Sequence, residues 1–136
     1  MQKPEHGWMR CILSIDEDTI EFDASDVPNN PLADLIECLW QCCRGTPSEV
    51  WWHLEPAGYY FQFLPQPEQV DFVLLYSEDS SNRRRTLRQV SVPMPGLLLM
   101  FWRSAKKVAS FGLGEPHWPQ VDIADLEKLR NKIENQ

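Results

Sequence analysis

The chain has 136 residues and a net charge of −7, from 20 acidic residues against 13 Lys and Arg. This length favours one domain over residues 1–136, and an apolar fraction of 43% excludes disorder as the default. The negative charge disfavours nucleic acid as the main ligand, because contacts to phosphate dominate that affinity. The longest apolar run, Leu97–Trp102, is far shorter than the roughly 18 to 20 residues that cross a bilayer, so we expect no membrane contact.

The N-terminal residues and the cysteines indicate a cytoplasmic protein. Residues 1–7 lack the charged-then-apolar order of a secretory signal. Three of the four cysteines fall within six residues, whereas a disulfide scaffold would space them more evenly. We therefore expect reduced thiols at Cys11, Cys38, Cys42 and Cys43.

The first elements are two strands that form a hairpin. Residues 8–15 and 19–23 are apolar and β-prone, and Asp16-Glu17-Asp18 separates them as a turn. In the second strand Ile20 and Phe22 alternate with polar and acidic residues. This alternation predicts that half of the acidic residues lie on a solvated face of the sheet.

A helix with clear end signals follows the hairpin. Asn30 can cap it, Pro31 suits the first helical position, and Gly45 ends it. Its apolar residues recur at helical spacing and predict one buried face: Leu32, Leu35, Ile36, Leu39, Trp40 and Cys43.

The remaining elements are four strands and two helices. We expect strands at 49–54, 59–64, 70–76 and 87–92, and helices at 95–111 and from Asp122 onward. The polar loop at 77–85 is expected to be mobile. The resulting order, ββαββββαα with tight hairpins, predicts an α+β fold. Its mainly antiparallel sheet would have five to six strands, with helices packed on one face.

Charge is distributed unevenly along the chain. Seven basic residues and no acidic one lie between Arg83 and Lys107, partly as a stripe on the second helix. Acidic clusters of the kind found near the N-terminus are more useful for steering a partner than for folding. We expect six carboxylates to contact a protein partner: Asp16, Glu17, Asp18, Glu21, Asp23 and Asp26.

Aromatic residues on the middle hairpin predict a second part of the same surface. Residues 50, 52 and 54 form one face of the strand, and Trp51, His53 and Glu55 form the other. Trp51 and Tyr60 are expected to be exposed, as anchors for a partner, unless a helix covers that face as well.

Catalytic and metal-binding alternatives have weaker support. His53 and Glu55 are the best acid–base pair, and a cysteine beside a histidine could act as a nucleophile, but no catalytic signature surrounds them. The cysteines lack the paired spacing of a zinc site, so we expect no metal and no cofactor. A small hydrolase or transferase stays an alternative.

Two short motifs resemble a class of small acidic bacterial immunity proteins, which neutralise antibacterial toxin domains. One is the stretch 22–35, a strand leading into a Pro-Leu-x-x-Leu helix, and the other is Trp-x-x-Glu-Pro-x-Gly-Tyr at 52–59. The resemblance implies an inhibitor and identifies no particular toxin. From the acidic cluster we expect a non-enzymatic protein that steers onto a basic active-site cleft and occludes it. A homo-oligomeric adaptor, with a possible homodimer, is a further alternative.

Overall fold

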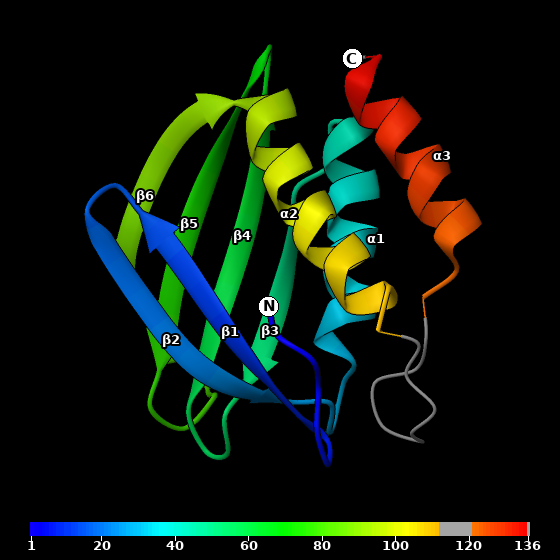
Figure 1. Ribbon diagram of the computed structural model, residues 1–136. Helices are drawn as coiled ribbons and strands as arrows, with labels where there is room; N and C mark the ends of the chain where they lie inside the picture. Colours follow the sequence, from blue (N-terminus) through cyan, green and yellow to red (C-terminus); the bar gives the residue numbers. More distant parts are fainter. Residues whose placement is uncertain (112–120, 136) are drawn as a thin grey trace.

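The computed structural model describes residues 1–111 and 121–135, which form one antiparallel sheet and three helices (Figure 1). All six strands are neighbours in sequence order, from β1 to β6. The elements are β1 (Trp8–Ile15), β2 (Asp18–Ser25), α1 (Pro31–Cys43), β3 (Ser48–His53), β4 (Gly58–Gln66), β5 (Gln69–Ser77), β6 (Arg85–Pro93), α2 (Met94–Ala109) and α3 (Ile123–Glu134). The predicted α+β class and the order ββαββββαα are confirmed.

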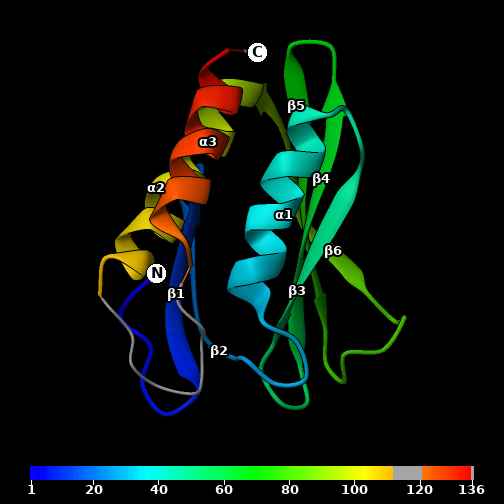
Figure 2. The same ribbon diagram turned by 90° about the vertical axis from the view of Figure 1, so that its right-hand side faces the viewer.

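The sheet is strongly curved, and the three helices lie on its concave side (Figure 2). The hairpin β1–β2 leaves the plane of the other strands, because only Ser25 opposite His53 joins β2 to β3. At its far end Arg88 of β6 forms an ion pair with Asp18 of β2. The hairpin and β6 thus face each other across the open side of a half-barrel.

Helix α1 begins and ends as its sequence predicts. The Asn30 side chain accepts hydrogen bonds from the backbone N–H groups of Leu32 and Ala33, at 3.1 and 3.2 Å. Pro31 occupies the first turn, and Gly45 follows the helix with a positive φ of 77°. Buried residues on one face of α1, including Leu35 and Leu39, pack against the sheet.

The core between sheet and helices is rich in aromatic side chains. Phe61 and Phe72 of the sheet lie 5.8 and 5.6 Å, ring centre to ring centre, from Phe101 of α2. The buried Trp102 indole donates to the Leu126 carbonyl at 2.7 Å and so joins α2 to α3. Apolar burial therefore holds the helices to the sheet and to each other.

Several elements differ from the predicted ranges at their ends. Helix α2 starts at Met94, one residue earlier than expected, and β6 extends from Arg85 to Pro93. Strand β3 stops at His53, so Glu55 belongs to the turn, where its φ is 60°. None of the helices that the structure describes combines the length and apolarity needed to cross a bilayer.

Candidate functional site

The outer face of the hairpin β1–β2 exposes apolar side chains among charged ones. Along β1 the residues alternate between exposed and buried, with Met9, Cys11, Leu13 and Ile15 directed into the core. Trp8 and Ile12 lie on the opposite face and are 39% and 43% exposed. Exposed large apolar residues beside carboxylates are typical of protein-binding surfaces.

Arg10 holds two of the predicted carboxylates on this face. Its Nε and Nη2 donate to the two carboxylate oxygens of Asp23 at 2.7 and 3.2 Å, and its Nη1 lies 3.5 Å from Glu21 Oε2. The hydrogen bond from Arg10 lowers the pKa of the Asp23 carboxyl below its ordinary value of 3.8. Glu21 and Asp23 are therefore fixed in place and partly neutralised, and are not free carboxylates.

The turn of the hairpin carries the carboxylates that stay unpaired. Asp16 and Glu17 are exposed, and within the described residues neither forms an ion pair. Asp16 adopts a positive φ of 56°, a conformation that Asp tolerates better than most residues. Asp18, the next residue, is neutralised by Arg88. The acidic cluster thus presents two free negative charges at its tip.

The predicted partner-binding residues do not form one continuous patch. Asp18 and Ser25 are the first and last residues of β2. The strand is eight residues long, so the two residues are about 23 Å apart. Asp26 follows β2 and is half-buried, and its backbone N–H donates to the Gly7 carbonyl at 3.2 Å. Asp26 therefore lies at the end of the hairpin opposite to Asp16 and Glu17.

Tyr60 is buried, and the prediction that it is exposed is wrong. It is only 3% exposed, because the Arg84 guanidinium lies 3.8 Å from the centre of its ring. Arg84 also forms an ion pair with Glu49, and Gln62 donates to the same carboxylate at 3.0 Å. The loop after β5, and not a helix, therefore covers the outer face of β4.

Trp51 is half-buried beside the same loop. Its indole Nε1 donates to Ser80 Oγ at 3.3 Å, and its ring centre lies 4.7 Å from that of His53. The loop predicted to be mobile is held by its own side chains: Ser77 and Asp79 accept hydrogen bonds from the Ser81 N–H. Trp51 is thus part of a packed turn region and offers a partner little free surface.

His53 and Glu55 do not form the expected acid–base pair. His53 ends β3, and its Nδ1 is 3.0 Å from the Val27 carbonyl oxygen. Glu55 is exposed in the turn, and within the described residues no hydrogen bond joins it to His53. Within the described residues, His53 contacts a backbone carbonyl and not the Glu55 carboxylate.

The cysteines are free thiols, and three of the four are buried. Burial raises the pKa of Cys11 and Cys42 to about 12, so both are protonated at neutral pH and poor nucleophiles. Within the described residues, no group of three or more His, Cys, Asp or Glu side chains could hold a metal ion. The arrangement supports packing as the function of Cys11 and Cys42.

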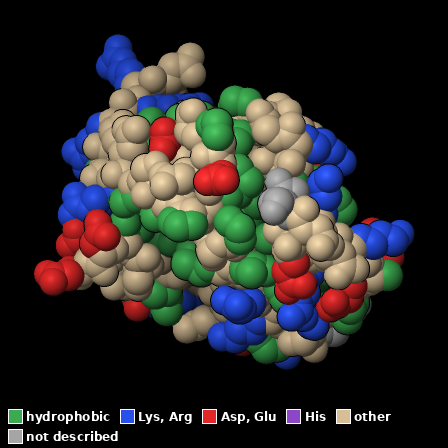
Figure 3. Space-filling model, turned by 90° about the horizontal axis from the view of Figure 1, so that it is seen from above, with side chains coloured by type: hydrophobic (Ala, Val, Ile, Leu, Met, Phe, Trp, Pro, Cys, Tyr) green, Lys and Arg blue, Asp and Glu red, His purple; other side chains and the backbone are tan. Residues whose placement is uncertain are grey.

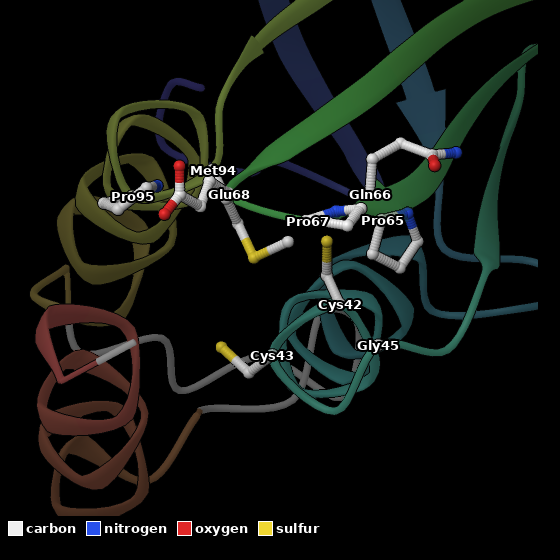
Figure 4. A pocket seen from close by; sticks show the side chains of 9 residues that line it. All are labelled: Cys42, Cys43, Gly45, Pro65, Gln66, Pro67, Glu68, Met94 and Pro95. Carbon is white, nitrogen blue, oxygen red and sulfur yellow. The ribbon is translucent and has the colours of Figure 1, made fainter.

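A pocket of about 520 Å³ lies between the end of α1, the β4–β5 turn and the start of α2 (Figure 4). Cys42 points toward Pro67 and Met94, whereas Cys43 points toward α3. Hydrophobic side chains gather at this end of the molecule, with charged side chains around them (Figure 3). The lining is mostly apolar and offers contact area but no acid–base pair.

Within the described residues, three of the seven cations of the basic segment, Arg84, Arg88 and Lys106, form ion pairs with neighbouring elements. Lys106 Nζ lies 2.9 Å from Glu127 Oε1 of α3, and Arg85 lies 5.3 Å from the ring centre of Tyr76. With Arg84 and Arg88 also paired, the segment does not form a continuous groove of free cations.

The exposure of Trp8 and Ile12 was not predicted, although the pattern of residues 8–15 indicates it. In residues 8–15 one alternating series is wholly apolar and the other, Trp8-Arg10-Ile12-Ser14, is mixed. A wholly apolar series indicates the core face, so the apolar members of the mixed series are the exposed ones.

Comparison with known proteins gives no match: no family model, curated protein or solved structure is similar enough to this chain to assign it to a family.

Proposed function

We propose that this chain is a non-enzymatic, cytoplasmic immunity-type protein that binds a cognate toxin domain and occludes its active site. The observation that carries the proposal is the outer face of the hairpin. It has two free carboxylates at the tip, Asp16 and Glu17, exposed Ile12 in the middle of β1, and exposed Trp8 at the opposite end of the hairpin, beside Ser25. The implied partner is a protein with a basic cleft.

The two parts of this surface have separate functions in binding. Free carboxylates at the tip attract a basic cleft over a distance and raise the association rate, and they occupy the place of an anionic substrate. Trp8 supplies contact area: with Asp23 and Leu54 it lines an open hollow of about 460 Å³. Tryptophan is among the residues that most often carry binding energy at interfaces.

The alternatives have less support from the structure. A hydrolase needs an activated nucleophile or an acid–base group, and Cys11 and Cys42 are buried, protonated thiols, whereas the His53 ring contacts the Val27 carbonyl and, within the described residues, forms no hydrogen bond with Glu55. In the part of the chain that the structure describes, three of the seven cations of the basic segment are paired with carboxylates of this chain, which also disfavours nucleic acid as the ligand.

Growth rescue tests the proposal. Proteins encoded by neighbouring reading frames are expressed singly and together with this chain, and the expected result is one toxic product whose effect the chain suppresses. The purified pair should form a complex, and a Trp8→Ala variant should weaken it by about 2 kcal/mol, roughly thirtyfold. If no neighbour is toxic and none binds, the immunity proposal is wrong.

A charge-reversal pair tests the steering function of the tip. Asp16→Lys with Glu17→Lys should slow association about tenfold or more at low salt, and the difference should shrink at high salt. The matched control is Glu78→Lys with Asp125→Lys, which changes the net charge equally at exposed positions outside the hairpin. Equal effects of both pairs would mean that only net charge matters and that the tip makes no specific contact.

A further inference from the structure

The free edge of β1 carries unpaired backbone groups. The Gln2 N–H donates to the Arg10 carbonyl at 2.9 Å, on the side of β1 that faces away from β2. Peptide groups alternate in direction along a strand, so those of Ile12 and Ser14 point to the same side as that of Arg10. Nothing in the described part of the chain pairs with the N–H and C=O groups of Ile12 and Ser14. The edge thus accepts one hydrogen bond, from Gln2 at Arg10, and is open at Ile12 and Ser14.

Helix α2 runs beside this edge (Figure 1, Figure 2). Residues of both elements line two hollows. The first, of about 240 Å³, is lined by residues 11–14 of β1, by Met100, Phe101 and Ser104 of α2, by Trp52 and Phe61 of the sheet at its base, and by Met1. The second, of about 150 Å³, is lined by residues 13–16, by Leu97 and Met100, and by Phe72, Val90 and Val92 of β5 and β6. Met100 is 39% exposed, so the apolar wall that α2 contributes is open to solvent.

The size and spacing of the hollows fit the side chains of an extended peptide. Pockets for small molecules usually measure about 300–1,000 Å³, and each hollow is smaller than that. Their β1 linings are offset by two residues, which is the repeat at which side chains of a strand return to the same side, about 6.7 Å. Two apolar side chains at positions i and i+2 would fill them.

Charge at the two ends of the groove favours one kind of segment. Asp16, which has no ion pair within the described residues, lines the second hollow. Lys107 is exposed on α2, one turn beyond Ser104 at the other end. A segment with a basic residue beside Asp16 and an acidic one beside Lys107 complements both ends.

We infer that the groove between β1 and α2 binds an extended segment of a partner protein by strand addition to β1. The segment forms backbone hydrogen bonds with Ile12 and Ser14, and places two apolar side chains, two residues apart, in the hollows. A Lys or Arg of the segment pairs with Asp16. The inference rests on the proposed function for the identity of the partner, which is the toxin domain, and names the part of the toxin that is bound.

Peptide selection on the full chain tests this inference without any toxin. Random octapeptides displayed on phage are selected on the wild-type chain and counter-selected on Met100→Asp. We expect enriched peptides with apolar residues at i and i+2 and a Lys or Arg at one end. Met100→Asp and Ser14→Pro should each weaken the best peptide at least tenfold, because one changes the apolar wall and the other removes a free N–H. Ile123→Asp, at an exposed apolar residue on α3, is the control and should leave affinity within twofold.

N-methylated peptides provide a second readout that does not depend on protein variants. Methylation of one alternating set of peptide amides should abolish binding, and methylation of the other set should preserve it. Strand addition is wrong if no peptide is enriched over the counter-selection, or if the enriched peptides bind Met100→Asp as well as the wild type.

Strand addition is also wrong if the wild-type chain is a dimer that Met100→Asp converts to a monomer, because a second copy of the chain then occupies the groove. If the Met100→Asp variant still rescues growth as well as the wild type does, the immunity proposal is retained, but the groove is not the surface that binds the toxin.

Discussion

Replacing Gly58 by alanine tests how tightly the outer face of β4 is packed. A Cβ at residue 58 would lie 2.6 Å from Trp51 Nε1 and 2.7 Å from Ser80 Oγ, both too close for a carbon atom. Those two atoms are hydrogen-bonded to each other at 3.3 Å, and Ser80 donates to the Pro56 carbonyl at 2.9 Å. One added methyl group therefore displaces the indole and the loop together.

The expected cost follows from three terms. Overpacking costs about 1–3 kcal/mol, and loss of the hydrogen bond between Trp51 and Ser80 adds about 0.5–1.5 kcal/mol. The lower backbone entropy of alanine in the unfolded chain returns about 0.4–1 kcal/mol. The net expectation for Gly58→Ala is a loss of roughly 2 kcal/mol in the free energy of unfolding.

Urea denaturation followed by circular dichroism and tryptophan fluorescence measures this loss. Gly96→Ala is the matched control, because no atom lies within 4 Å of a Cβ at residue 96 in α2. That change should stabilise the protein by about 0.5–1 kcal/mol, since alanine is the better helix former. If Gly58→Ala is as stable as the wild type while Gly96→Ala behaves as expected, Trp51 and Ser80 do not pack tightly against residue 58, and the reasoning is wrong.

Two further predictions concern titrating groups. Because the pKa of Asp23 is lowered in the folded protein, its ion pair with Arg10 stabilises the fold fully above pH 3.8, the ordinary pKa of Asp, and this stabilisation is lost as the pH falls through the folded-state pKa. Carbon-13 NMR should place the titration midpoint of Asp23 below 3.8, and Arg10→Ala should raise it to 3.8. Cys11 and Cys42, whose pKa burial raises to about 12, should resist a disulfide reagent in the native protein at neutral pH, and half-exposed Cys43 should react first. Rapid native labelling of Cys42 would contradict its burial.

Local signals predicted the elements of this fold well. The Asn30 cap, Pro31 and Gly45 fix α1 within two residues because each acts on the backbone beside it. Strand β1 matches its predicted range because its alternation spans the whole strand. The largest errors are at strand ends, where pairing with a neighbour extends the strand past its apolar residues, as in β6.

The candidate site was harder to predict because exposure depends on distant residues. Tyr60 has the pattern of an outward-facing strand residue, yet Arg84, 24 positions later, covers its ring. The carboxylates of Glu21 and Asp23 are exposed as predicted, but the strand register places them beside Arg10. Register and loop packing decide such contacts, and neither can be derived from composition or periodicity.

The binding groove depends on a break in the sheet ladder that no local pattern predicts. Only Ser25 and His53 pair between β2 and β3, so the hairpin can fold over the helices and bring β1 beside α2. With a full β2–β3 ladder, β1 would extend the sheet away from α2, and Ile12 and Ser14 would face water without an apolar wall. A flat, open edge of that kind favours aggregation, because it pairs with any other free strand. With α2 beside it, the same edge admits a single extended segment, so the break that creates the groove also restricts what can bind there.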